Sequence, residues 1–147
     1  MIPRILAATA VTASLILGST VAASADAVTD RQSAMKNMGA MAKTVGDMLR
    51  GNTEFNAEAA NAAIVKAHDG LVEFATYFPE GSAGGESKAG PMIWEDPAGF
   101  AAAIEKVQGD LNDAVAANPQ TKEELQAVFQ QVGSNCQACH EKYRLPD

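Results

Sequence analysis

The sequence predicts an all-α protein folded as an up-down-up-down antiparallel four-helix bundle. Four segments repeat an apolar residue alternately every three and four positions, which gives each predicted helix one apolar stripe. No segment shows the alternation of apolar and polar residues that is typical of a strand. Turn residues separate the four segments, and two of the three connections are short, so neighbouring helices are expected to run antiparallel.

Turn residues set the boundaries of the first two helices. The predicted helices span residues 29–50, 56–78, 97–117 and 121–144. Gly51 and Asn52 end the first helix, and Pro79 with the glycine-rich stretch 81–90 ends the second. The long connection that follows returns to the bundle near Trp94, whose expected role is to pack under this loop.

The third and fourth helices begin at capping residues. Asp96 and Pro97 fit the N-cap and the first position of a helix. Thr121 and Glu124 have the spacing of a capping box, in which each side chain binds the backbone of the other residue. These signals predict helix starts at residues 97 and 121.

The first 27 residues are predicted to be a secretory signal peptide. Arg4 precedes an apolar stretch from Ile5 to Gly18, and small residues then offer cleavage after Ala25 or Ala27. The stretch is shorter than the ~20 residues that span a bilayer, although a retained lipid anchor is the alternative. Residues 28–147 then form one bundle domain, which we expect in the periplasm and not in a membrane.

The chain is acidic, with a formal net charge of −7. This charge argues against binding to nucleic acid and to anionic membranes, because both are themselves negative. It is compatible with a basic redox partner in the periplasm, but an acidic surface also simply favours solubility.

The two cysteines of the chain lie in the sequence Cys136-Gln-Ala-Cys139-His140. Cys-x-x-Cys-His is the attachment sequence of c-type haem. On a helix, positions i, i+3 and i+4 share one face, so both thiols and the imidazole can meet one haem edge. The motif therefore predicts one covalently attached haem c, with His140 as an axial ligand of the iron.

Three other roles for the cysteines are less well supported. A thiol redox pair favours an electropositive helix start, whereas Cys136 and Cys139 lie late in a helix and Glu141 follows. A zinc site needs four ligands, and only His68 remains as a further soft ligand. A disulfide at this spacing within a helix is geometrically poor. His68 otherwise reads as a solvated residue at the edge of the second helix.

The late position of this motif within a four-helix pattern resembles the class II c-type cytochromes, and the cytochrome c′ family in particular. The likeness covers essentially the whole predicted mature chain. It rests on Arg31-Gln32-Ser33-Ala34-Met35, Gly84-Gly85-Glu86, Pro91 with Ile93-Trp94, Val132-Gly133 before Cys136-Gln-Ala-Cys139-His140, and Tyr143-Arg144.

The resemblance implies a five-coordinate haem iron that binds nitric oxide and carbon monoxide and is capable of one-electron transfer. It places His140 as the proximal ligand and Met35 on the opposite face as an apolar cap. It also places Arg31 where its guanidinium can pair with a haem propionate, and Gln32 and Glu86 near the haem edge. The acid–base groups of an enzyme such as a peroxidase are not offered by the first helix, so no enzymatic activity is expected.

Met35 leaves a second function open. Low-spin members of class II use a methionine from this region as a sixth iron ligand and carry electrons. Axial Met/His pairs raise the haem potential, whereas methionine is also a common filler of helical cores. The sequence is therefore compatible with a gas-binding protein capped by Met35 or with a low-spin electron carrier ligated by Met35.

Two further expectations concern the surface and the haem surroundings. The family often forms homodimers through its first two helices, and alanines at positions 57, 59, 62 and 63 would allow a close approach, although they also favour the helix itself. Tyr143, which follows His140 by three residues, is expected to pack beside the haem.

Overall fold

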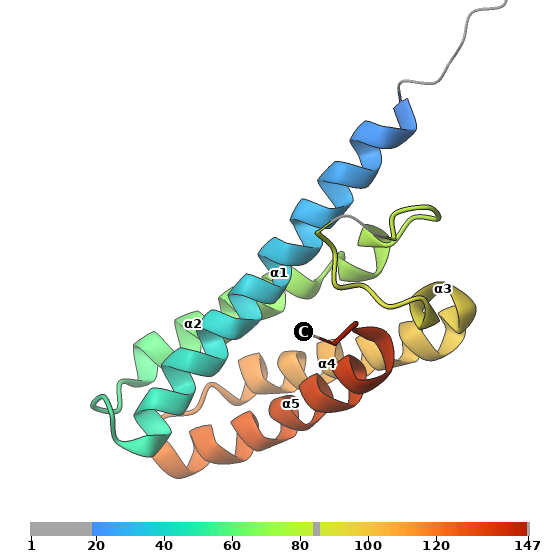
Figure 1. The fold of residues 1–147 in the computed structure, drawn as a ribbon. Coiled ribbons are helices and arrows are strands. Elements are labelled where there is room, and N and C mark those ends of the chain that lie inside the picture. The colour runs from blue at the N-terminus through green and yellow to red at the C-terminus, as the bar shows by residue number, and fades with distance from the viewer. Residues whose placement is uncertain (1–18, 84–85, 147) are drawn as a thin grey trace, which may run out of the picture.

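The computed structural model describes residues 19–83 and 86–146, with side chains described from Ala25 onward. Four long helices, α1 (Ser19–Arg50), α2 (Ala57–Leu71), α4 (Pro97–Ala117) and α5 (Lys122–Tyr143), form the bundle. A 3-10 turn, η1 (Phe74–Tyr77), and a one-turn helix, α3 (Met92–Glu95), lie in the long connection. Figure 1 shows the long helices side by side and antiparallel in chain order, so the predicted fold class is confirmed.

α1 begins at Ser19, before the predicted helix start at residue 29. Its first turns project beyond the other helices (Figure 1), and the predicted cleavage positions at Ala25 and Ala27 lie within α1. Residues 1–18 lie outside the described part of the chain, so the signal peptide stays a prediction. Over the described residues, no helix has the length and apolar content needed to cross a membrane.

The second helix is shorter than the sequence predicts, and the predicted end at residue 78 is wrong. α2 ends at Leu71, and the chain tightens into η1 three residues later. Gln108 on α4 explains the stop, because its side-chain amide donates to the backbone carbonyls of Leu71 and Val72. These carbonyls have no partner within a helix that ends here. An apolar stripe continues into η1, which is why periodicity alone extended the helix.

The predicted helix starts are confirmed by their caps. Asp96 accepts a hydrogen bond from the Gly99 amide at 3.0 Å, with Pro97 in the first turn of α4. Thr121 and Glu124 form both halves of the capping box at the start of α5. Because these side chains satisfy amides that lack a helical partner, they fix where α4 and α5 begin.

The core is one cluster of buried side chains along the bundle axis. Val45, Leu71, Leu111 and Leu125 are at most 1 % exposed, and they come from all four long helices. Full burial of one such side chain stabilises the fold by about 1.5–3 kcal/mol. The core therefore holds the helices together from the end of the bundle where α1 and α2 are joined to the other end, where Phe74, Phe100 and Tyr143 belong to it.

At the other end, the start of α4 and the end of α5 are joined by polar contacts. Asp96 also accepts hydrogen bonds from Lys142, at 2.6 Å, and from the Tyr143 hydroxyl, at 3.2 Å. The backbone of residues 88–90 pairs with residues 143–145, since the Gly90 amide donates to the Tyr143 carbonyl at 2.8 Å and the Leu145 amide to the Lys88 carbonyl at 2.8 Å. This end of α5 is thereby held by both α4 and the long connection.

Two glycines of α4 should respond oppositely to substitution by alanine. A Cβ at Gly99 would lie 2.2 Å from a carboxylate oxygen of Asp96 and 2.7 Å from the Tyr143 hydroxyl, so Gly99→Ala should displace these contacts and lower stability. Nothing lies within 4 Å of a Cβ at Gly109, so Gly109→Ala should raise stability by about 0.8–1 kcal/mol through helix propensity. Urea unfolding of both variants measures this, and a Gly99→Ala protein as stable as Gly109→Ala would contradict the packing described here.

Candidate functional site

A cavity of about 710 Å³ lies at the end of the bundle where α5 finishes. This volume is within the range of small-molecule and cofactor sites, about 300–1,000 Å³. α1, α4, α5, η1 and residues 86–89 supply its walls. All of the site residues named from the sequence line it: Arg31, Gln32, Met35, Glu86, Cys136, Cys139 and His140. The fold thus brings together residues that are more than 100 positions apart in the chain.

The Cys-x-x-Cys-His motif occupies one turn near the end of α5. Cys136 and Cys139 are partly buried free thiols, and burial raises the pKa of each. His140 is exposed at the cavity edge, and its pKa is lowered first by partial desolvation and then by the positive charge of Arg144. A lowered pKa keeps the imidazole neutral, which is the form that binds a metal.

Two methionines of α1 line the cavity. Met35 is partly buried, Met38 is 8 % exposed, and both line the cavity together with Ala42. Met38 follows Met35 by three residues and so lies on the same face of α1. The sequence had singled out Met35 only. The spacing of the two methionines is the signal from which the second could have been found.

An aromatic row closes the interior side of the cavity. The rings of Phe74, Phe78, Phe100 and Tyr143 follow one another with centroid separations of 5.1, 4.7 and 5.1 Å, each pair edge to face. Tyr143 therefore lines the same cavity as the motif, and its packing beside the haem stays a prediction. The phenylalanines could not be assigned to the site in advance, because η1 and the long connection bring them together.

Arg31 is buried, and its contacts are with the long connection. Its guanidinium donates to the carbonyls of Tyr77 and Ser82 and to the hydroxyls of Ser82 and Ser87. It also lies 4.4 Å from the centre of the Phe78 ring, a favourable cation–π distance. Arg31 thus fastens Tyr77, Ser82 and Ser87 of the long connection to α1. This role was not foreseen, and the pairing of Arg31 with a haem propionate stays a prediction.

Gln32 and Glu86 meet at the mouth of the cavity. The Gln32 side-chain amide donates to the Glu86 backbone carbonyl at 3.4 Å, and both residues are exposed. Gly84 and Gly85, part of the same sequence resemblance, lie outside the described residues. Trp94 does not line the cavity. Its indole donates to the carbonyls of Phe78 and Pro79, at 3.2 and 3.3 Å, so it packs under the loop as predicted.

The charges around the cavity differ from those of the whole chain. Arg31, Lys36, Lys88 and Arg144 line it, against the single carboxylate of Glu86, although the formal net charge of the chain is −7. The cavity therefore combines an apolar interior with a basic border. Haem is an apolar disc with two carboxylates at one edge, so this donor set and this charge distribution fit it.

The geometry disfavours a zinc site and a disulfide at the cysteines. Within the described ranges, no three His, Cys, Asp or Glu side chains gather as a metal site. His68 lies between α2 and α4, with its ring nitrogens 3.0 Å from Asp69 Oδ1 and 2.8 Å from Asn112 Oδ1, and it does not line the cavity. The thiols are not joined in a disulfide. Attachment of a haem remains the role that uses the whole motif.

The sequence profile of the family described as Cytochrome C′ matches residues 26–144. The chain belongs to the cytochrome c′ family. The family is one of c-type haem proteins, and its cofactor is haem c attached through a pair of cysteines, here Cys136 and Cys139.

Named relatives and solved structures agree with this assignment. The chain is 32 % identical over 118 residues to cytochrome c-556 of Agrobacterium tumefaciens, covering 80 % of this chain and 96 % of the relative. It is 31 % identical over 139 residues to cytochrome c′ of Rhodopseudomonas palustris, covering 88 % and 90 %. A nitric oxide complex of a variant cytochrome c prime from Alcaligenes xylosoxidans superimposes with a TM-score of 0.70 at 30 % identity, covering 84 % of this chain and 97 % of that one.

The contacts of Arg31 predict how the long connection responds to Arg31→Lys. Lysine keeps the charge but lacks the planar fork that binds several acceptors at once. Since each charged hydrogen bond contributes about 1.5–3 kcal/mol, we expect a glutamate-specific protease to cut at Glu80 and Glu86 at least about tenfold faster in Arg31→Lys. Arg50→Lys is the control, because Arg50 is exposed and binds only within the end of α1. Equal cleavage rates in wild type and Arg31→Lys would show that Arg31 does not hold this segment.

Proposed function

We propose that this chain is an exported haem protein whose iron takes one axial ligand from the protein, His140, and binds a diatomic gas such as nitric oxide or carbon monoxide on the face toward α1. Bound haem supplies an iron centre that can take up such a gas and can exchange one electron. The side chains around the cavity decide which of these uses is favoured. The proposal assigns binding, and no catalysis, to the site.

The composition of the α1 wall carries this proposal. Of the described residues that line the cavity, His140 is the only histidine. The α1 side contributes Met35, Met38 and small residues, together with the polar side chains of Arg31, Gln32 and Lys36, and its described lining residues include no imidazole or carboxylate as an opposing ligand. The nitric oxide complexes of two variants of one relative, at 30 and 31 % identity to this chain, support a gas as the ligand.

Each site residue then has a distinct role in the proposal. Cys136 and Cys139 form thioether bonds to the haem, and His140 holds the iron on the α5 side. Met35 closes the opposite side against water and larger ligands. The basic side chains that line the cavity, the buried Arg31 among them, compensate the haem carboxylates, while Gln32 and Glu86 border the exposed haem edge.

A second candidate function is electron transfer with a methionine as sixth ligand. The observation in its favour is that two thioethers, from Met35 and Met38, line the same cavity as His140. The basic border of the cavity would then dock an acidic redox partner. This differs from the basic partner suggested by the net charge, because the border, and not the whole surface, meets a partner that exchanges electrons with the haem.

Export to the periplasm rests on the N-terminal sequence and on the attachment motif. A mature chain that begins at Asp26 or Val28 is expected, and intact mass of the purified protein measures it. A chain that retains Met1 would contradict processing at these positions. The pairing of two chains through α1 and α2 stays a prediction, and sedimentation that shows only monomer at high concentration would remove it.

Met35→Leu separates the two candidate functions. Leucine conserves the volume of methionine, so the fold should tolerate the change, and it removes the sulfur. If Met35 is a cap, the affinity of the ferrous protein for nitric oxide should stay within about twofold. If sulfur holds the iron for all but ~1% of the time, the affinity should rise about a hundredfold in Met35→Leu. Met38→Leu is the matched control on the same face of α1. A large rise in Met35→Leu alone would replace gas binding with electron transfer.

A further inference from the structure

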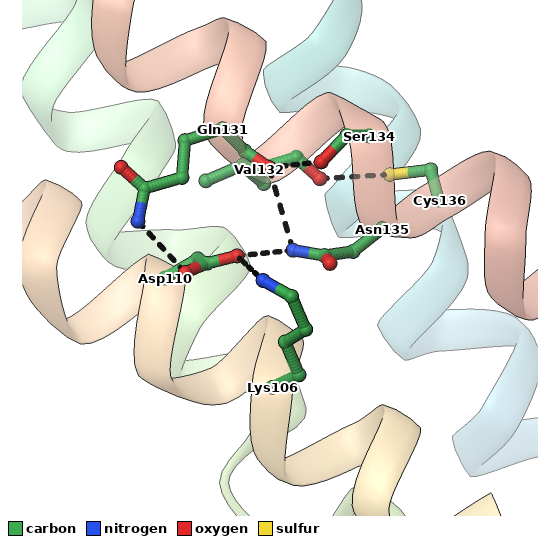
Figure 2. A network of polar contacts seen from close by, with 7 residues as sticks. All are labelled: Lys106, Asp110, Gln131, Val132, Ser134, Asn135 and Cys136. Carbon is green, nitrogen blue, oxygen red and sulfur yellow. Dashed lines mark hydrogen bonds and ion pairs between the residues drawn. The ribbon is translucent and has the colours of Figure 1, made fainter.

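A buried carboxylate lies between α4 and α5, close to the haem attachment motif but outside the cavity. Asp110 of α4 is 8 % exposed. It accepts hydrogen bonds from Lys106 Nζ at 2.9 Å, from Gln131 Nε2 at 2.8 Å and from Asn135 Nδ2. Figure 2 shows Lys106 approaching from α4, while Gln131 and Asn135 reach the same carboxylate from α5.

This arrangement satisfies a group that is otherwise costly to bury. A buried carboxylate destabilises the fold unless charged or hydrogen-bonding partners surround it. The amine of Lys106 is the charged partner, and its side chain is 62 % exposed, so the two amides are the interior donors. Hydrogen bonds from Lys106, Gln131 and Asn135 lower the pKa of Asp110 and keep it ionised. The carboxylate can therefore hold both amides at neutral pH.

Asn135 connects this network to the motif. It directly precedes Cys136, is itself 8 % exposed, and lines the haem cavity. Its amide nitrogen also lies 3.4 Å from the Gln131 backbone carbonyl. Gln131 and Asn135 are four residues apart and so share the face of α5 that is turned toward Asp110. Cys136 follows Asn135 directly, Cys139 lies one turn further along α5, and both line the cavity together with Asn135.

Apolar packing by itself leaves this turn of α5 under-determined. Hydrophobic contacts are non-directional, so Val132 and its neighbours resist separation of α4 and α5 better than they resist a small rotation or slide. Two hydrogen bonds to one ionised carboxylate have a fixed direction and length. At the turn that precedes the motif, they fix the rotation of α5 about its own axis and its axial position relative to α4. A functional constellation of this kind must be held within about 0.5 Å and 10–20°.

We propose that Asp110 and Asn135 are positioning residues for haem attachment: they fix the turn of α5 that presents Cys136, Cys139 and His140 to the cavity. The inference rests on attachment of the haem through Cys136 and Cys139. It adds two residues that do not contact iron and are not part of the Cys-x-x-Cys-His motif. They determine the direction in which the motif faces.

A charge exchange tests the proposal in the haem-loaded protein. Asp110→Asn removes the charge that both amides bind, and Asn135→Asp sets two carboxylates against each other. In either single variant we expect at least half of the purified chains to lack covalent haem by intact mass, and amide exchange of residues 132–140 to be about tenfold faster in the loaded fraction. The double variant restores one carboxylate and one amide with their places exchanged, so both values should return toward those of wild type.

Two additional variants keep the outcome interpretable. Thr121→Ala weakens the cap at the far end of α5 and lowers stability by about as much as loss of one hydrogen bond, so it should leave haem content and the ferric EPR spectrum unchanged. If Asp110→Asn yields no folded protein, Gln131→Met serves instead, because it removes one donor to Asp110. It should give a smaller loss of covalent haem and a smaller rise in the amide exchange rate. Wild-type haem content in both single variants, or equal losses in Thr121→Ala, would overturn the proposal. A wild-type protein without covalent haem would instead refute the attachment on which it rests.

Discussion

The Cys-x-x-Cys-His motif occupies one turn of α5, and the direction in which that turn faces governs the rest of the site. Two thiols and one imidazole must point into the same cavity, and α1 must lie opposite with side chains that leave room for a haem. The contacts of Asp96 with Lys142 and Tyr143 hold the end of α5 after the motif. The contacts of Asp110 with Gln131 and Asn135 hold the turn before it. Polar contacts thus bracket the motif on both sides, while the apolar core supplies most of the cohesion.

The sequence was sufficient for the parts of the fold that depend on local chemistry. Helix starts at Pro97 and Lys122 follow from caps whose partners lie within three residues. The bundle follows from apolar periodicity, and the haem site from a motif of five residues. Longer-range contacts were beyond this reasoning. The end of α2 depends on Gln108, which lies 36 and 37 residues from the carbonyls that it binds. The partners of Arg31 lie 46 to 56 residues away in the sequence, so no local sequence pattern predicts them.

Charge illustrates the same difference between composition and arrangement. A formal net charge of −7 suggests an acidic surface with basic partners. The structure places four basic side chains and one acidic side chain around the cavity, which is the part of the surface that a haem carboxylate or a redox partner meets. Electrostatic attraction at short range is set by these few residues, because solvent and salt screen the remainder within about 8–10 Å. The net charge therefore describes solubility better than recognition.

In the proposed site the iron has one protein ligand, and α1 supplies a cover and no bond. The ferric EPR spectrum of the purified, haem-loaded wild-type protein tests this most directly, because spin state reports the number and strength of the axial ligands. A single protein ligand, His140, predicts a high-spin signal. A low-spin signal, accompanied by methionine–iron charge transfer in the optical spectrum, would contradict it and would make a thioether of α1 the sixth ligand.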